Sequence, residues 1–340
     1  MIAVDANGAD QGPAAVAEGA RRSGLDVLLF GPASAVGASD GHVEVVDAPV
    51  TIGGHEEPAQ AVRSRPDASI VQAARSVAEE RAEALVSAGS TGPTLAAATL
   101  RVRRLRGVHR PALAVLLPIP GGPVLLLDAG ASVEARPEHL VQFAYMGACF
   151  MEAVYARERP RVGLLSVGEE SGKGTPAVLA ARERIEAGGG LNFVGNVEGF
   201  DIPGAGADVV VTDGFTGNVA LKVLEGTSKL MREAIGAAVR SSPVSAVGGL
   251  LIRGRVGRLR EQLDPEAVGG AILLGLRKPV VVAHGSFGPR GIASAIGLAR
   301  RAVDEDMVGR TAAALEAAGA LRSAGAGSVA EVTPESDGGG

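Results

Sequence analysis

The chain contains very few aromatic residues and almost no cysteine. Its 340 residues include 7 Phe, 2 Tyr and no Trp, and Cys149 is the only cysteine. The core must therefore be aliphatic, and modules that stack nucleic-acid bases on aromatic rings are excluded. A single cysteine also excludes a disulfide framework or a thiolate metal cluster, and it indicates a reducing compartment.

An excess of positive charge and long apolar runs are lacking as well. The chain has 33 Lys+Arg against 38 Asp+Glu, a net charge of -5, which excludes a nucleic-acid binder driven by bulk positive charge. No apolar run approaches the roughly 18 residues that span a bilayer. The first apolar run, residues 2–4, follows Met1 without the charged and apolar segments of a signal peptide. We therefore expect a cytoplasmic protein, for which contact with the inner face of the membrane remains open.

What is abundant is an alternation of short apolar runs with longer stretches rich in Ala, Arg and Glu. This pattern predicts parallel βαβ units, and the continuous apolar runs predict strands covered by helices on both faces. Many of the 49 glycines stand where a run ends, at the turn from strand to helix. The predicted fold class is α/β, a doubly wound and largely parallel sheet. The predicted strands are residues 2–4, 27–30, 43–46, 84–87, 112–117, 124–127, 162–167, 192–194, 209–212 and 280–283.

The helical stretches and the end of the chain complete this organisation. We expect one α/β catalytic domain over residues 1–322, with a helical hairpin at 225–265 for dimerisation or membrane contact. Residues 323–340 have no periodicity and few large apolar residues, which predicts a disordered tail. The predicted helices are residues 72–81, 94–104, 137–156, 176–187, 218–239 and 291–321.

Polar, glycine-rich loops follow several of the predicted strands. In an open α/β sheet, ligands bind at the carboxyl ends of the strands. Loops 87–92 and 213–218 each enter a helix, so their N–H groups and hydroxyls can converge on an anion at the positive end of the helix dipole. Any one such loop is more often an ordinary N-capped turn, but several on the expected edge favour a phosphate site. The candidate substrate-binding residues are Asp5, Gly8, Asp10, Ser87, Gly89, Ser90, Thr91, Gly92, Asp213, Gly214, Thr216 and Gly217.

Several other chemistries lack their motifs. The segment around Lys173 differs from a nucleotide-binding P-loop, because Gly174 stands where Ser or Thr must follow the lysine. No GxGxxG follows the first strand, and the five histidines are scattered. We therefore expect no cofactor and no metal. Cys149 lies in a strongly apolar helical stretch and is interpreted as a buried, inert thiol.

Nine sequence motifs follow one another along nearly the whole body of the chain: IAVDANGAD at 2–10, EEPAQAVR at 56–63, SAGSTG at 87–92, RPALAVLLP at 110–118, LLDAGA at 126–131, RPEHLVQFA at 136–144, VGLLSVGEESGKG at 162–174, FVGNVEGFDI at 193–202 and DVVVTDGFTGNVALK at 208–222. Taken in this order, they resemble the motifs of the bacterial phosphate acyltransferases. The resemblance implies transfer of an acyl group from acyl carrier protein to inorganic phosphate at the start of phospholipid synthesis. The chain departs from the usual pattern at Asn7, Ala9, Ser90, Pro93 and Ser132.

The resemblance implies a fold similar to phosphotransacetylases and the isocitrate dehydrogenase class, a homodimer, and no metal or nicotinamide cofactor. Phosphate is already an anion and the leaving thiol is a moderate acid, so little base strength is needed. The enzyme must instead position phosphate and stabilise the developing oxyanion. For these tasks the sequence offers Lys173, Asn218 and His284 as catalytic residues, with Asp5 and Asp10 orienting neighbouring donors.

Two clusters of arginines suggest partners. One ends the helix after the loop at 87–92, and the other follows the apolar cluster at 247–252. Because acyl carrier protein is acidic, such patches on an otherwise acidic enzyme can steer it, although a solvated helix face gives the same pattern. The second cluster also suits a membrane surface or a dimer interface. A downstream acyltransferase is a further expected partner. The candidate partner-binding residues are Arg101, Arg103, Arg104, Arg253, Arg255 and Arg258.

Two other functions stay open on the sequence alone. One is a short-chain phosphotransacylase that uses acyl-coenzyme A. The other is a non-catalytic scaffold that binds acyl carrier protein, which the departures at Ser90, Pro93 and Ser132 motivate.

Overall fold

One sheet of eleven strands runs through the whole protein. The computed structural model describes residues 1–322, so the tail expected at 323–340 lies outside the described residues. The strand order is β3-β2-β1-β4-β11-β10-β5-β6-β9-β7-β8. The strands are β1 Ile2–Asp5, β2 Val27–Gly31, β3 Val43–Asp47, β4 Ala84–Ser87, β5 Ala112–Leu117, β6 Val124–Leu127, β7 Arg161–Leu165, β8 Asn192–Val197, β9 Val209–Val211, β10 Ala271–Leu274 and β11 Val280–Val282.

The sheet consists of two parallel parts that run in opposite directions. Seven of the ten strand pairings are parallel, and the antiparallel pairs are β11 with β10, β10 with β5, and β5 with β6. After these three reversals, β6, β9, β7 and β8 point opposite to β1, β2, β3, β4 and β11. This arrangement confirms the α/β class and the largely parallel sheet.

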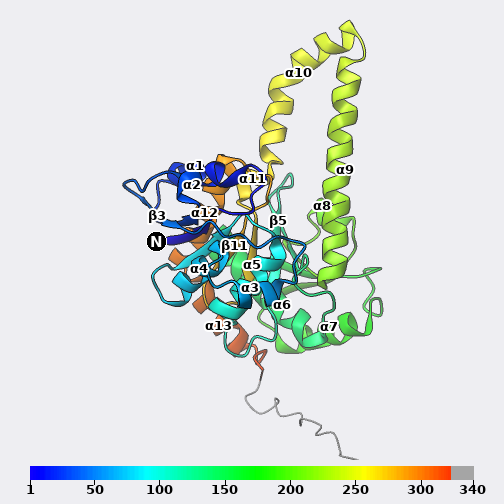
Figure 1. Ribbon diagram of the computed structural model, residues 1–340. Helices are drawn as coiled ribbons and strands as arrows, with labels where there is room; N and C mark the ends of the chain where they lie inside the picture. Colours follow the sequence, from blue (N-terminus) through cyan, green and yellow to red (C-terminus); the bar gives the residue numbers. More distant parts are fainter. Residues whose placement is uncertain (323–340) are drawn as a thin grey trace, which may run out of the picture.

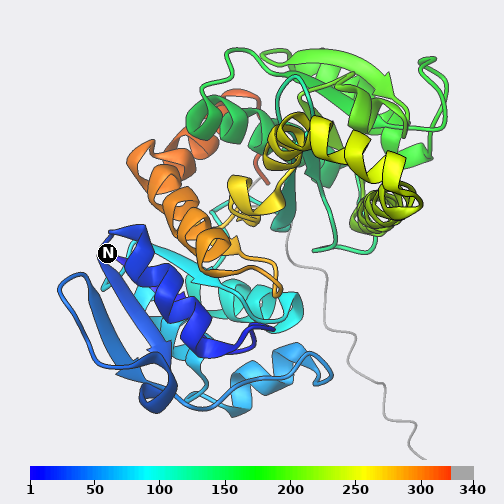
Figure 2. The same cartoon turned by 90° about the horizontal axis from the view of Figure 1, so that it is seen from above.

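Helices cover both faces of the sheet, as the continuous apolar runs predict. In β1, Ile2 and Val4 face one cluster, which includes α1, α6, α12 and α13, whereas Ala3 faces a second cluster around α4 and α5. Figure 2 shows α12 lying between the N-terminal half and the half that contains α7 and α9. The helices of the body are α1 Gly12–Ser23, α2 Ala33–Val36, α3 Pro58–Ser64, α4 Ser69–Ala78, α5 Thr91–Ala97, η1 Ala98–Val102, α6 Pro137–Tyr155, α7 Pro176–Gly188, α8 Asp201–Gly204, α11 Pro265–Val268, α12 Pro289–Asp304 and α13 Met307–Ala317.

A long helical hairpin projects from the body (Figure 1). It consists of α9, Gly214–Arg240, and α10, Pro243–Gln262, and begins directly after β9. Only Gly214 and Gly217 of α9 are buried, and α10 has no buried residue. The hairpin therefore begins earlier than residue 225, inside the loop that the sequence predicts to bind phosphate.

Candidate active site

A buried carboxylate, Asp5, organises the loops that follow β1 and β4. Asp5 is 3% exposed, and its oxygens accept hydrogen bonds from Ser69 Oγ at 2.6 Å and Ser87 Oγ at 2.9 Å. Ser87 Oγ in turn accepts bonds from Thr94 Oγ1 and the Gly89 N–H, both at 3.1 Å. Burial raises the pKa of Asp5 to about 6, although the two serine bonds act to lower it. This network holds the loop at 87–92 in one conformation.

Asn7 extends the same network. Its Nδ2 donates to Ala48 O at 3.0 Å and to Ser69 Oγ at 3.0 Å, and its side chain is buried. Asn7, one of the departures from the family pattern, thus belongs to the network that supports the loop at 87–92.

Three loops meet beside this network. A Cβ on Gly8, whose φ is +84°, would lie 2.9 Å from Gly89 Cα, so glycine is required for the close approach. The Asp10 N–H donates to Gly285 O at 2.9 Å, which joins the loop after β1 to the loop after β11. Ser90 and Thr91 are exposed at the first turn of α5, where unpaired backbone N–H groups attract anions.

His284 lies on the third of these loops. Its Nδ1 accepts a bond from the Ser286 N–H at 3.2 Å and lies 2.8 Å from Ser286 Oγ. Because Nδ1 is an acceptor here, the neutral ring carries its proton on Nε2. The ring is exposed, so this proton is available to a bound substrate.

The buried Asp5 predicts a specific pH dependence of stability. The pKa is 3.8 in a free carboxyl and about 6 in the fold, so the folded state holds the proton more tightly. The free energy of unfolding therefore falls as pH rises from about 4 to 6, by about 3 kcal/mol at most. Asp5→Asn cannot ionise and is expected to remove this fall, as measured by urea unfolding across that range. Asp67→Asn, at an exposed site, is the control, and identical pH profiles for the two variants would contradict the assignment.

A second buried carboxylate, Asp128, organises the loop after β6. Oδ1 accepts the N–H groups of Leu113 at 2.9 Å, Gly130 at 3.1 Å and Ala131 at 2.9 Å, and Oδ2 accepts that of Ser132 at 2.8 Å. Burial raises the pKa of Asp128, and these four backbone bonds oppose the rise. The sequence places this residue in a polar loop but gives it no role.

The start of α9 packs tightly on this loop. A Cβ on Gly214 would lie 2.2 Å from Ser132 O, and one on Gly217 would lie 1.9 Å from Asp128 O. Asn218 is exposed, and its Oδ1 lies 3.7 Å from where a Cβ on Gly130 would be. Close packing therefore explains why glycine stands at 214 and 217, independently of any ligand.

Asp213 and Thr216 form an ordinary helix cap. Asp213 accepts the Thr216 N–H and the Thr216 Oγ1–H, each at 2.8 Å. Asp213 thus uses both hydrogen-bond donors of Thr216 in this conformation, and the role of Thr216 in binding phosphate stays a prediction.

Lys173 lies on the loop after β7. Asn196 of β8 fixes this loop, because its Nδ2 donates to Glu170 O at 2.9 Å and to Lys173 O at 3.0 Å. The Lys173 side chain is exposed and forms no ion pair with another described residue. Its ammonium group is therefore available to an anionic substrate.

The predicted residues form two groups and do not share one edge of the sheet. Because β6 and β9 run opposite to β1, β4 and β11, their carboxyl ends lie at opposite ends of the strands. The expectation of a common edge is therefore wrong. The first group is Asp5, Gly8, Asp10, Ser87, Gly89, Ser90, Thr91, Gly92 and His284, and the second is Lys173, Asp213, Gly214, Thr216, Gly217 and Asn218.

The remaining candidate groups are placed as follows. Cys149 is buried, and burial raises the pKa of its thiol to about 11, in agreement with an inert thiol. Within residues 1–322, no three His, Cys, Asp or Glu side chains gather as a metal site requires. None of the helices in that part of the chain is long and apolar enough to cross a bilayer.

Solved structures with the same fold define the class. A phosphotransacetylase from Streptococcus pyogenes matches with a TM-score of 0.59 and 18% identity, covering 89% of this chain and 94% of that one. A branched-chain phosphotransacylase from Enterococcus faecalis matches with a TM-score of 0.54 and 16% identity, covering 89% and 99%. The protein therefore has the phosphotransacetylase fold.

Sequence comparison gives the family. Residues 1–310 match the family described as "Fatty acid synthesis protein". A phosphate acyltransferase of Bacillus pumilus is 41% identical, covering 90% of this chain and 95% of its own, and one of Thermobifida fusca is 43% identical, covering 89% and 88%. The chain belongs to this family of phosphate acyltransferases. It is thus an acyltransferase that transfers an acyl group to phosphate in phospholipid synthesis, as the motifs predict.

Proposed function

We propose that the acyl donor is the thioester of acyl carrier protein and that phosphate binds where the loops after β1, β4 and β11 meet. The observation that carries this placement is the preformed first turn of α5. Its loop is held by Asp5 and Ser87, and its hydroxyls at Ser90 and Thr91 face solvent. A rigid helix start with free donors binds an anion at little reorganisation cost.

The twist of the sheet supports a site that uses both groups of loops. Four strand-to-strand steps separate β4 from β6. At about 20–25° each, they rotate the second group by roughly 80–100° relative to the first. The strand ends that carry the two groups would point in opposite directions on a flat sheet. With this rotation, both groups can face the same side of the protein. Phosphate on one group would meet a thioester on the other.

The reaction then proceeds by direct attack. A phosphate oxygen adds to the thioester carbonyl, and a tetrahedral intermediate forms with negative charge on the former carbonyl oxygen. Its collapse breaks the carbon–sulfur bond and releases acyl-phosphate and a thiolate, which takes a proton. Lys173 stabilises the anionic phosphate and the oxyanion, Asn218 donates to the oxyanion, and His284 Nε2–H donates a hydrogen bond to the departing sulfur, which takes its proton from water.

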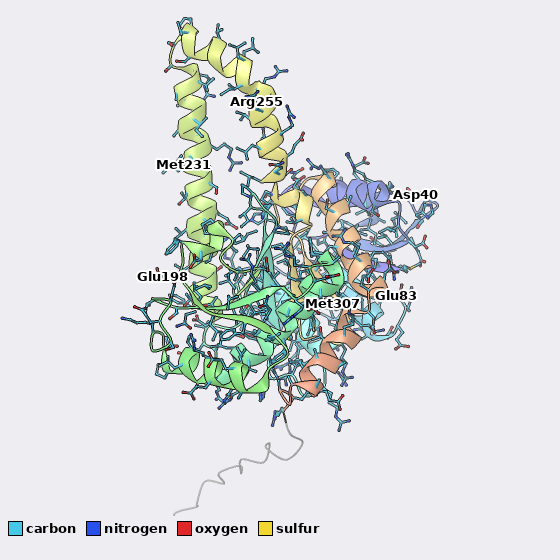
Figure 3. The ribbon with its side chains drawn as sticks, turned by 180° about the vertical axis from the view of Figure 1, so that it is seen from behind. Asp40, Glu83, Glu198, Met231, Arg255 and Met307 are labelled. Carbon is cyan, nitrogen blue, oxygen red and sulfur yellow. The ribbon has the colours of Figure 1, made fainter. Side chains whose placement is uncertain are left out.

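Arginines on the hairpin are the proposed contact for the carrier protein. Arg253, Arg255 and Arg258 are exposed on α10, and none of them pairs with a carboxylate within residues 1–322. Figure 3 shows Arg255 on α10 and Met231 on α9, both away from the body. Unpaired charge on a projecting surface accelerates association with an acidic partner.

The hairpin also presents apolar side chains that a lone chain leaves exposed. Leu250 is 65% exposed, Leu251 81%, Leu230 65% and Val247 60%. Several large apolar side chains exposed on one hairpin favour a contact with another protein or a membrane. We propose that the base of the hairpin pairs with a second copy and that the region around Leu251 touches the membrane. The localisation would then be cytoplasmic and peripheral on the inner face.

Leu251→Glu is expected to weaken liposome binding at least about tenfold, because burial of one leucine side chain contributes about 1.5–3 kcal/mol. Activity on soluble donor should persist. Liposome flotation measures the first and thiol release the second. Phe200→Glu, at a comparably exposed residue off the hairpin, is the control. Unchanged flotation of the Leu251 variant would contradict the membrane contact.

The choice of donor is tested by phosphate-dependent thiol release. We expect rapid formation of acyl-phosphate from long-chain acyl carrier protein and much slower formation from acetyl- or butyryl-coenzyme A. The opposite preference would favour a short-chain phosphotransacylase. Tight binding of acyl carrier protein without thiol release would favour the scaffold, and in either case this proposal fails.

A further inference from the structure

A basic cavity lies at the far end of α5 from the proposed phosphate site. It has a volume of about 400 Å³ and is lined by Arg103, Arg104, Arg106 and Arg322, together with Thr99, Leu105, Gly107 and Val108. The cavity opens where η1 ends, at Val102. Because α5 and η1 together span residues 91–102, the two places are separated by roughly 18 Å of helix.

The positive charges of Arg103, Arg104 and Arg106 in this cavity are not neutralised by carboxylates of residues 1–322. In the described part of the chain, Arg101, Arg103, Arg104 and Arg106 form no ion pair with an acidic side chain. Arg277 Nε–H donates to Arg104 O at 3.2 Å, which places one more guanidinium against the backbone of a lining residue. The carboxyl end of a helix carries only about half a negative charge. Three arginines within four residues bring more positive charge than is needed to balance it.

The positive charge of the cavity also affects the nearby residue His109. Burial lowers the pKa of His109, and the charges of Arg322 and Arg104 lower it further, against the opposing charge of Glu138. Arg101 Nε is buried and has no hydrogen-bond partner among the described residues, but Arg101 does not line the cavity.

The cavity wall is built from fixed backbone. Arg103 has a φ of 70°, a conformation that non-glycine residues rarely adopt, and its N–H donates to Ala98 O at 2.9 Å. Opposite it, the Arg322 N–H donates to Gly107 O at 2.9 Å, and a Cβ on Gly107 would lie 3.0 Å from Leu321. The arginines therefore project from a defined rim, which distinguishes them from a solvated helix face.

We propose that this cavity binds a small soluble ligand that carries two or more phosphate groups. Guanidinium groups match phosphate oxygens in a bidentate manner, and a cavity of this size falls within the range of small-molecule sites, about 300–1,000 Å³. The arginine lining does not suit an acyl chain. The concave shape suits a compact polyanion better than the convex surface of a carrier protein, to which the sequence assigns Arg101, Arg103 and Arg104.

The inference is independent of the acyl donor, so its test uses none. Full-length protein is titrated with pyrophosphate by calorimetry in about 0.15 M salt, where exposed charges are largely screened. We expect two pyrophosphate ions per chain, one of which inorganic phosphate displaces from the proposed catalytic loops. The other pyrophosphate ion, which phosphate does not displace, is the one in the cavity. In the double variant Arg103→Gln/Arg106→Gln, this ion should bind at least about tenfold more weakly. Backbone contacts hold Arg103, and Arg106 has no hydrogen bond or ion pair to a described residue, so the fold should persist.

Arg22→Gln is the matched control, because Arg22 is exposed and unpaired with any described acid on α1. If the double variant melts early, Arg106→Gln alone serves the same comparison. An isotherm that is unchanged in the arginine variants would overturn the inference. If wild-type protein in about 0.15 M salt bound no pyrophosphate ion that resists phosphate, the arginines would attract anions only diffusely. That result would also overturn the inference. A failure of acyl transfer itself would appear in thiol release and leave this titration interpretable.

Discussion

Lys173→Ala is expected to reduce phosphate-dependent thiol release by about 100- to 1,000-fold, the usual effect of removing one preorganised oxyanion donor. The loss follows from the position of the lysine, whose backbone is fixed by Asn196 while its ammonium group has no carboxylate partner within residues 1–322. The thiol-release assay at saturating donor measures the effect, and the melting temperature should not change because the side chain is exposed.

Lys222→Ala is the control for this result. Lys222 is also exposed, lies on α9 near the second group of loops, and pairs with Glu225 at 2.7 Å. Surface pairs of this kind contribute about 0–1 kcal/mol, so the variant should keep near-normal activity. Equal rates for wild type and Lys173→Ala would remove Lys173 from the mechanism.

Gly217→Ala is expected to destabilise the fold by more than about 3 kcal/mol, at the upper end of overpacking effects. Its Cβ would lie 1.9 Å from the carbonyl oxygen of Asp128, and neither the helix nor the buried loop can move away cheaply. For a protein of this size, the melting temperature should fall by roughly 5–10 °C. Calorimetry measures the shift.

Gly226→Ala lies on the same helix and provides the comparison. Nothing lies within 4 Å of a Cβ there, and alanine is favoured over glycine in a helix by up to about 1 kcal/mol. Its melting temperature should stay equal or rise. If both variants melted alike, the packing of α9 on the loop at 128–132 would be wrong.

The strands were predictable because each is a short apolar run with a glycine or polar turn behind it. All ten predicted strands exist, with ends that differ by up to three residues, and only β10, Ala271–Leu274, is missing from the prediction. The predicted helix at 291–321 is two helices, because Asp306 has a φ of 44° and starts α13. The helix α1 was missed because it contains Gly19, where a Cβ would lie 2.5 Å from Ile292 Cβ. Close helix packing selects glycine there against its low helix propensity.

The missing strand also explains the error about the site. β10 is antiparallel to both of its neighbours and begins the reversal between the two halves of the sheet. Its residues are as apolar as those of a parallel strand, so no local pattern reveals its direction. Without it, every predicted loop appears to open on the same edge.

The chemistry of individual residues was predictable only in part. Exposed groups at strand ends, such as His284 and Lys173, stand out in the sequence. The supporting residues do not, because Ser69 and Asn196 act through contacts with Asp5 and the loop at 168–173 that are remote in sequence. Asp213 and Thr216 form a helix cap, and the sequence of such a loop does not distinguish a cap from an anion site.

The most direct test of the account is a crystal structure with phosphate bound. We expect the ion at the first turn of α5, in contact with the N–H groups and hydroxyls of Ser90 and Thr91 and beside His284. Phosphate bound only at the Asp213 cap, with the start of α5 empty at saturating concentration, would contradict it.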